Sequence, residues 1–310
     1  MGEMPHSALN IQEILREVFA DPALVYDRSR FAGGMTNYNY IMEIHGALYV
    51  IREPGPKTEK FIDRVAEERN NQIASDQGIN SECVYFDKEA GVKISRFIEQ
   101  ARTFTEINPA SSGALRAAAA LLNRIHTSSV PFLNTFEWET ELTKYESIVR
   151  SMGCGFFLDY EQRRQQLSAF VRRHVSSLRS MPCHNDTVPE NFLMNRRTKA
   201  SYLIDWEYSG MNDPAWDVAM YIAEAQLPEE AIREFFSYCY GSREIPAAEE
   251  MKLKCFVMAQ DLLWSVWALI RYYSGEDFLD YLYSRYSRFC RNLFELTRRT
   301  DYPLADMMWT

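Results

Sequence analysis

The sequence lacks an uninterrupted apolar stretch of the length that would predict a membrane span. Its most apolar stretch, residues 255–270, is shorter than the ~20 residues that a spanning helix needs and carries Gln260 and Asp261 at its middle. We therefore expect a buried helix there and no insertion into a membrane. Residues 1–19 contain no basic region followed by an apolar core, so no secretory signal is predicted and a cytoplasmic location is expected.

Zinc-binding, P-loop and nucleic-acid-binding patterns are missing as well. The six cysteines are scattered, with neither a Cys-x-x-Cys pair nor a His/Cys spacing suited to zinc, so we expect reduced thiols. No Gly-x-x-x-x-Gly-Lys-Ser/Thr segment occurs, which argues against a P-loop enzyme. The 43 acidic side chains outnumber the 34 basic ones, and the net charge of −9 argues against a nucleic-acid partner. A small cationic substrate would suit that field.

What the sequence does contain is a change of pattern near residue 98. Before that point, β-branched and aromatic runs predict strands at residues 38–44, 47–51, 81–86 and 92–98. His45-Gly46 is expected to form a tight hairpin. Residues 58–77 show the spacing of an amphipathic helix, which Gly78 would end.

Helical periodicity dominates beyond a linker expected at 99–103. Helices are predicted at residues 110–128, 135–151, 160–180, 213–225, 228–240, 246–273 and 276–299. The sequence therefore predicts an α+β fold of two lobes, with a small N-terminal lobe at residues 1–98 and a larger, mainly helical C-terminal lobe at residues 99–310.

The segment most indicative of chemistry is His184-Asn185-Asp186-Thr187-Val188-Pro189-Glu190-Asn191. Its His-x-Asp-x-x-x-x-Asn pattern matches the kinase catalytic loop, in which the Asp accepts the substrate hydroxyl proton and the Asn holds magnesium. Asp205 follows the apolar run 202–204, so we expect a second metal-binding Asp at the end of a short strand. We therefore predict catalytic roles for Asp186, His184 and Asn191, and metal ligation by Asn191 and Asp205. The alternative is an Asx-capped loop without chemistry.

Two further patterns suit the phosphates of a nucleotide. The backbone of Gly33 and Gly34, with the side chains of Thr36 and Asn37, could bind phosphate oxygens, although a Gly-Gly pair is more often a structural turn. Arg52 ends the strand 47–51, where protein kinases place a phosphate-binding Lys, and Arg binds phosphate as a planar fork. Either Glu67 or Glu68 is expected to orient Arg52, and the other to lie on a solvated helix face.

These residues together resemble the choline/ethanolamine kinase family, of the bacterial choline kinase type, in the aminoglycoside-phosphotransferase-like branch of the kinase fold. The resemblance runs through residues 33–37, Tyr49-Val50-Ile51-Arg52, the segment 184–191 and Ile204-Asp205-Trp206-Glu207-Tyr208-Ser209, and so covers nearly the whole chain. It implies a protein-kinase-like fold whose small, mixed β-sheet lobe binds the nucleotide and whose helical lobe holds the catalytic loop and a choline pocket. It also implies ATP and Mg²⁺ as cofactors.

The resemblance extends to the residues expected to bind the substrate. Trp264 and Trp267 lie three apart on one helix face and resemble the Trp-x-x-Trp that walls the family's choline pocket. Further pocket residues implied by the resemblance are Tyr208, Glu224, Phe278 and Tyr281. Quaternary ammonium groups are held by aromatic faces and a nearby carboxylate. Without the resemblance, core packing would be the preferred interpretation of the Trp pair.

The predicted function is transfer of the γ-phosphoryl group of ATP to the hydroxyl of choline. One alternative keeps the chemistry and changes the phosphoryl acceptor to ethanolamine or an aminoglycoside. Ethanolamine would need hydrogen-bond acceptors in the site, and an aminoglycoside would need a wide acidic cleft. Family members often carry Tyr where this chain has Phe278, so one hydroxyl is expected to be missing from the pocket while the ring still offers a π face. A second alternative is a catalytically silent nucleotide-binding protein on a kinase scaffold. Asp186, Asn191 and Asp205 are all present, which favours an enzyme.

Overall fold

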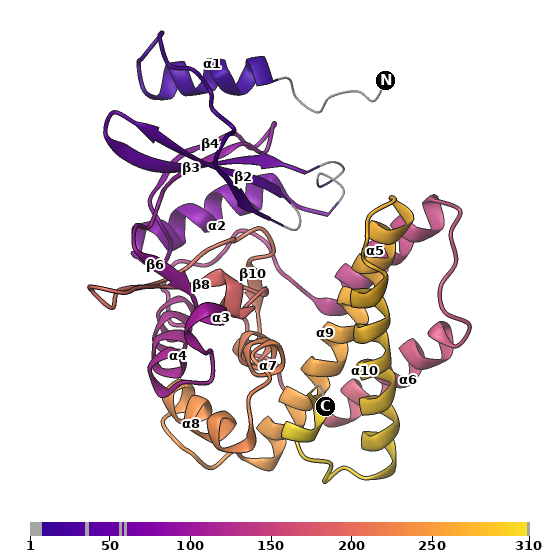
Figure 1. Ribbon diagram of the computed structural model, residues 1–310. Coiled ribbons are helices and arrows are strands. Elements are labelled where there is room, and N and C mark those ends of the chain that lie inside the picture. Colours follow the sequence, from indigo (N-terminus) through magenta and orange to yellow (C-terminus); the bar gives the residue numbers. More distant parts are fainter. Residues whose placement is uncertain (1–7, 35–36, 56–57, 59–60, 309–310) are drawn as a thin grey trace. The chain divides into compact units, whose positions relative to one another are not determined.

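The computed structural model describes residues 8–34, 37–55, 58 and 61–308, so the predicted phosphate-binding Thr36 lies outside the described residues. The chain forms two compact units. The first comprises residues from 1–102 and 194–207, and the second comprises residues from 103–193 and 208–310 (Figure 1). The division expected at residue 98 stays a prediction. The segment 194–207 returns to the first unit, so each unit contains two stretches of chain.

The first unit is built on a five-stranded antiparallel sheet with the order β1-β2-β3-β5-β4. Its strands are β1 (Phe31–Gly33), β2 (Asn37–Ile44), β3 (Ala47–Pro54), β4 (Cys83–Phe86) and β5 (Lys93–Arg96). Between β2 and β3, His45 and Gly46 have φ angles of 51° and 75°. Two successive positive φ angles are what a two-residue hairpin turn requires, and the predicted hairpin is confirmed.

Two helices flank this sheet, α1 (Ala8–Val18) and α2 (Arg64–Asp76), and Figure 1 shows them on opposite sides of it. Leu15 of α1 is fully buried against Ile51 and Ile94 of the sheet. Helix α2 begins at Arg64 and not at Thr58 as predicted, because the Asp63 carboxylate accepts the N–H groups of residues 65 and 66 and caps the helix there.

Short strands lead into both segments predicted to carry the chemistry. In the second unit β7 (Met181–Cys183) pairs with β10 (Gly210–Asn212) and ends immediately before His184. A three-stranded sheet has the order β6 (Ala101–Thr103), β8 (Phe192–Asn195), β9 (Ser201–Leu203). Strand β9 ends just before Asp205, so the strand expected at residues 202–204 is present with its bounds shifted by one residue.

The second unit is mainly helical, as predicted. Its helices are α3 (Phe104–Ile107), α4 (Ser112–His126), α5 (Trp138–Ser151), α6 (Tyr160–His174), α7 (Pro214–Glu224), α8 (Glu229–Tyr240), α9 (Ala247–Tyr273) and α10 (Leu279–Arg298), with 3₁₀ turns η2 (Pro189–Asn191) and η3 (Ala305–Met307). Helix α6 ends at His174 and not at Ser180. The backbone turns extended at Val175, and the segment that follows, with its β-branched and Ser residues, favours helix weakly.

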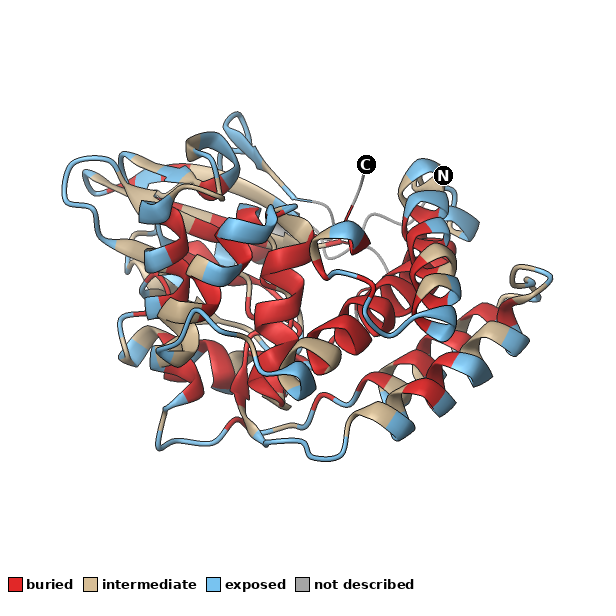
Figure 2. Cartoon of the chain, turned by 90° about the horizontal axis from the view of Figure 1, so that it is seen from below, coloured by how far each residue is buried: buried red, intermediate tan, exposed pale blue. Residues whose placement is uncertain are grey.

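Helix α9 is the core of the second unit. It is long and apolar enough to cross a membrane by composition alone, but its residues 252–271 are all buried, and it packs against α5, α6, α7 and α10. Figure 2 shows buried residues in red and exposed ones in blue. The prediction of a buried helix at residues 255–270 is thus confirmed, and all six cysteines carry free thiols, as expected.

Candidate active site

The segment 184–191 brings two of the predicted catalytic residues into contact. The Asn191 Nδ2 donates to the backbone oxygen of Asp186 at 2.8 Å and to its Oδ2 at 3.1 Å. Asp186 remains partly exposed, whereas His184 is fully buried. The backbone N–H of Asp186 donates to the His184 Nδ1 at 3.3 Å, so the buried His184 ring supports the backbone that carries Asp186.

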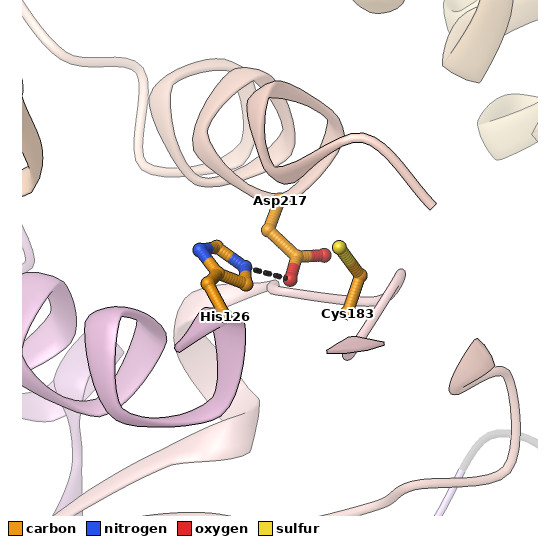
Figure 3. Close-up of side chains that lie close together, drawn as sticks. All are labelled: His126, Cys183 and Asp217. Atoms are coloured by element: carbon orange, nitrogen blue, oxygen red, sulfur yellow. Dashed lines mark hydrogen bonds and ion pairs between the residues drawn. The ribbon is translucent and has the colours of Figure 1, made fainter. Parts of the chain in front are cut away.

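A residue that was not predicted, Asp217 of α7, holds this loop in place. Its carboxylate accepts the backbone N–H groups of His184 at 2.9 Å and Asn185 at 2.7 Å, and its backbone oxygen accepts the Thr187 hydroxyl at 2.7 Å. His126 of α4 lies 2.8 Å away from the same carboxylate (Figure 3). The sequence feature that could have revealed Asp217 is a charged residue inside the apolar stretch of α7. An acidic side chain in such a stretch is buried only if it is paired.

His126, Cys183 and Asp217 lie close enough together to hold a metal ion, with ligand atoms within 4.8 Å of one another. Hydrogen bonding explains this cluster better. Three N–H groups already occupy the Asp217 carboxylate, from His126, His184 and Asn185. The Cys183 thiol also has a partner within the protein, since its Sγ donates to the Asn212 backbone oxygen at 3.4 Å.

Asn185 connects the catalytic loop to the chain that follows Asp205. Its φ of 67° is left-handed, a conformation that Asn tolerates better than most residues. The Asn185 side chain donates to the Tyr208 backbone oxygen at 3.0 Å and accepts from Asn212 at 2.9 Å. The position of Tyr208 therefore depends on the same loop that carries Asp186.

In the first unit, Arg52 forms a buried ion pair with Glu67. The Arg52 Nη1 contacts the Glu67 carboxylate, Nη2 donates to its other oxygen at 3.2 Å, and Nη2 also donates to the Gly91 oxygen at 3.1 Å. The partner of Arg52 is thus Glu67. Glu68 is partly exposed, as expected for the glutamate without this role.

Two further cations surround Glu67, and neither was predicted. The Arg64 Nη1 donates to Glu67 at 2.6 Å, and the Lys93 Nζ lies 3.9 Å from it. Burial would raise the pKa of Glu67, but the three positive charges, Arg52 first, outweigh burial and lower this pKa to about 2. Glu67 therefore stays ionised and fixes the orientation of three cationic side chains.

Glu207 adds a second buried carboxylate to this group. Its Oε2 accepts from the Asn37 Nδ2 at 2.8 Å and lies 3.6 Å from the Arg64 Nη1. Burial, followed by the negative charges of Asp205 and Glu67, raises the pKa of Glu207 to about 7. The predicted metal ligand Asp205 and the predicted phosphate-binding Arg52 and Asn37 therefore share one region of the first unit.

The glycine pair at 33–34 adopts a conformation that other residues avoid. Gly33 and Gly34 have φ angles of 94° and 135°, and a Cβ on Gly34 would lie 2.0 Å from the Asn37 backbone oxygen. Only glycine fits at position 34, which agrees equally with a structural turn and with a loop that approaches phosphates closely.

Five aromatic side chains of the second unit form a contiguous cluster, named here the aromatic cluster: Tyr208, Trp264, Trp267, Phe278 and Tyr281. Ring centroids lie 4.9 Å apart for Tyr208–Trp264, 6.1 Å for Trp264–Trp267, 5.2 Å for Trp267–Phe278 and 6.3 Å for Trp267–Tyr281, all edge to face. All the predicted aromatic pocket residues are thus brought together.

The aromatic cluster lies near the predicted base. Burial raises the pKa of Tyr281 to about 12, and the guanidinium of Arg285 opposes this rise. The negative charges of Glu224 and Asp186 add to it. Asp186 directly follows Asn185, whose side chain donates to the Tyr208 backbone oxygen at 3.0 Å, so one hydrogen bond joins the loop of the predicted base to the aromatic cluster within the second unit.

Glu224, which the resemblance implies as a pocket residue, is paired with arginines of the same unit. Both of its oxygens are bound by Arg285, at 2.5 and 2.6 Å, and Arg288 donates to one of them at 3.2 Å. The same arginines bind the fully buried Asp261. Glu224 is therefore part of an internal ion-pair network with residues that the sequence did not single out.

Comparison with known proteins agrees with this arrangement. The family model of choline/ethanolamine kinase matches residues 29–252. The chain is 34% identical over 273 residues to Protein LicA of Haemophilus influenzae, covering 85% of this chain and 79% of LicA. The chain belongs to the choline/ethanolamine kinase family. It is therefore a phosphotransferase that acts on an alcohol group, as predicted.

Solved structures confirm the predicted fold. The choline kinase LicA from Streptococcus pneumoniae is 31% identical, with a TM-score of 0.78 over 92% of this chain and 99% of that one. A GDP complex of aminoglycoside 2'-phosphotransferase-IIIa is 16% identical, with a TM-score of 0.63 over 94% of this chain and 99% of that one. The second likeness concerns the fold alone. Both place the chain in the two-lobed kinase-like class.

Asp217→Asn should lower kcat about a hundredfold, because displacing a catalytic group by about 1 Å has effects of that size. The amide keeps one acceptor oxygen but turns an NH₂ group toward a backbone N–H of residues 184–185. The measurement is ADP release at saturating substrates, together with urea unfolding.

Asp213→Asn is the matched control for this variant. Asp213 begins the same helix and accepts two backbone N–H groups, those of Arg179 and Ala215, but none from the catalytic loop. It should lose stability and keep a kcat close to that of the wild type. Equal losses of kcat in the two variants would show that Asp217 has no special role in positioning the loop.

Glu67→Gln should reduce the free energy of unfolding by about 3–5 kcal/mol, because three buried cations lose their counter-charge. Glu68→Gln should change it by less than about 0.5 kcal/mol. Since the folded pKa of Glu67 is lowered from 4.5 to about 2, its contribution is present above pH 4.5 and is lost as the pH falls toward 2. Urea unfolding from pH 7 to pH 2 measures this, and similar curves for both variants would contradict the assignment.

Proposed function

We propose that the chain transfers the γ-phosphoryl group of ATP to the hydroxyl of choline, in the cytoplasm. The observation that carries the proposal is the aromatic cluster beside Asp186. A quaternary ammonium offers no hydrogen-bond donor and binds aromatic faces. A choline head group held by Trp264, Trp267 and the rings around them would leave its hydroxyl, two carbons away, within reach of Asp186.

Asp186 is proposed as the general base. Its carboxylate accepts the hydroxyl proton as the choline oxygen forms a bond to the γ-phosphorus and the bond to the β–γ bridging oxygen of ATP breaks, which releases ADP. Asn191 holds the carboxylate at 3.1 Å, and His184 supports its backbone. Protein groups in this reaction mainly position the reactants and stabilise charge.

The first unit is proposed to bind the nucleotide phosphates through Arg52 and the loop at residues 33–37. Arg52 Nε and Asn37 Oδ1 are both buried and have no hydrogen-bond partner among the described residues. An unpaired buried polar atom costs about 1–3 kcal/mol, so a donor such as Arg52 Nε suits a phosphate oxygen. Glu67 keeps this guanidinium oriented.

The residues present also fit a magnesium ion. Asp205, in the first unit, offers carboxylate oxygens, and Asn191, in the second unit, offers an amide oxygen; both are donors that this hard cation prefers. Burial first, and then the negative charges of Asp205 and Glu67, raise the pKa of Glu207, and a divalent cation at Asp205 would oppose this rise. A magnesium ion held by these residues would supply positive charge to offset the negative charge that develops during transfer.

Ethanolamine is the second candidate acceptor, because the family is named for both amino alcohols. A primary ammonium needs hydrogen-bond acceptors, whereas the aromatic cluster offers ring faces. An aminoglycoside would need several acidic groups, and Glu224 is already paired with arginines. These contacts favour choline. A coupled ADP-release assay with choline, ethanolamine and kanamycin as separate acceptors tests the proposal, and the highest kcat/KM should be found for choline.

Asp186→Ala should fold normally and lose activity by about a thousandfold or more, because the base and its positioning dominate this chemistry. Its affinity for ATP should stay close to that of the wild type, since Asp186 is assigned to the acceptor hydroxyl. ADP release at saturating choline and ATP binding by calorimetry are the measurements. Near-normal turnover would rule out Asp186 as the base.

Trp267→Ala should weaken choline binding about thirtyfold, because a cation on a desolvated aromatic face gains about 2 kcal/mol. The KM for ATP should change little. Trp267→Phe is the matched control: it keeps a ring face and should recover most of the loss. If both variants bound choline as tightly as the wild type, the aromatic cluster would not be the choline site, and the phosphotransferase assignment would still stand.

A further inference from the structure

Beside the aromatic cluster lies a closed network of four charges, two acids and two arginines: the partly buried Glu224 of α7, and the buried Asp261 of α9 and Arg285 and Arg288 of α10. Each acid touches both arginines, at distances between 2.5 and 3.2 Å. Two positive and two negative charges give a net charge of zero. The side chain of Glu224 is 17% exposed, and those of the other three are exposed by 6% or less.

Arg285 joins this network to the aromatic cluster. Its guanidinium binds both oxygens of Glu224 as a planar fork, and its carbon lies 4.9 Å from the centre of the Tyr281 ring. One side chain thus fixes a carboxylate and a ring of the aromatic cluster at the same time. Arg288 differs from it, because it binds Asp261 through two nitrogens, at 2.5 and 2.7 Å, and reaches Glu224 only at 3.2 Å.

The engagement of Glu224 decides what the site can offer a substrate cation. A primary ammonium carries three N–H donors. Its burial is unfavourable unless hydrogen-bond acceptors of the protein replace the water molecules that it gives up. Lone pairs of Glu224 that point at Arg285 are not available for this purpose. A trimethylammonium group has no N–H donors, so the pairing of Glu224 with Arg285 costs it no hydrogen bond.

We propose that Arg285 is a positioning residue that sets the preference for a quaternary over a primary ammonium substrate, by holding Glu224 in a bidentate ion pair beside the aromatic cluster. The inference rests on the proposed function, since it concerns selection of the amino alcohol at that site. The inference goes beyond the proposed function because it assigns selectivity to Arg285, which is expected to contact neither choline nor ethanolamine.

Arg285→Gln tests the inference. Releasing Glu224 from its fork should raise the ratio of kcat/KM for ethanolamine to that for choline about tenfold or more, the size expected for one hydrogen bond to a charged group. Arg285→Lys, which keeps the charge and replaces the fork by a single point contact, should give an intermediate ratio. This milder variant also decides the matter if Arg285→Gln does not fold, because an unchanged ratio in folded Arg285→Lys would overturn the inference.

Two further variants separate selectivity from stability. Arg288→Gln removes the other arginine, so it should destabilise the network comparably and change the ratio by less than about twofold, because Glu224 keeps both contacts to Arg285. The double variant Arg285→Gln/Glu224→Gln should return the ratio toward that of the wild type, because it removes the released carboxylate. A raised ratio that persists in the double variant, or an equal rise in Arg288→Gln, would overturn the inference.

The wild-type enzyme distinguishes failure of this inference from failure of the proposed function. If the wild type does not phosphorylate choline, the choline assignment falls. If it prefers choline and the ratio is the same in the wild type, Arg285→Lys and Arg285→Gln, only the role of Arg285 falls.

Discussion

The buried carboxylate of Asp217 is the interaction on which the second unit depends. It accepts two consecutive backbone N–H groups of the catalytic loop and a third N–H from His126. A buried charge is stable only when its hydrogen bonds are made, so these contacts hold the loop in one conformation. Asn185 then joins the loop to Tyr208, and through Tyr208 the base and the aromatic cluster share one scaffold. The orientation of Asp186 relative to a bound substrate thus follows from a residue that touches neither.

In both units a glutamate orients an arginine, but the charge around the two pairs differs. Around Glu67, three cations surround one carboxylate, and their charges suit the phosphates of a nucleotide. Around Glu224 the charges cancel, and what remains beside them are ring faces. A guanidinium fork fits a carboxylate bidentately, so each pair fixes an angle as well as a distance. Electrostatic character thus differs between the two regions although the pairing chemistry is the same.

Much of the candidate site could be predicted from local sequence, because the segments at 184–191 and 204–209 each place their predicted functional residues within a few positions of one another. The hairpin at His45-Gly46 and the buried helix at residues 255–270 depend on local pattern in the same way. Contacts across long stretches of chain could not be predicted. Arg285 reaches Glu224 across 61 positions and Asp217 reaches His126 across 91, and no periodicity links such pairs. The start of α2 was misplaced because the capping carboxylate of Asp63 outweighed the hydrophobic pattern before it.

The charge balance beside the aromatic cluster also has a consequence for selectivity. A site with an unpaired carboxylate would bind any small cation, including primary amines and metal ions, because Coulomb attraction discriminates poorly between them. A site whose carboxylates are already paired attracts cations less strongly but discriminates between them better. It offers ring faces to a cation without N–H donors and leaves the N–H groups of a primary amine without acceptors. Rejection by unmet hydrogen bonds is stronger than rejection by size. Selectivity for one amino alcohol can therefore come from charges that the substrate never contacts, which is why we propose a role in selectivity for the arginine that pairs with Glu224 beside the aromatic cluster.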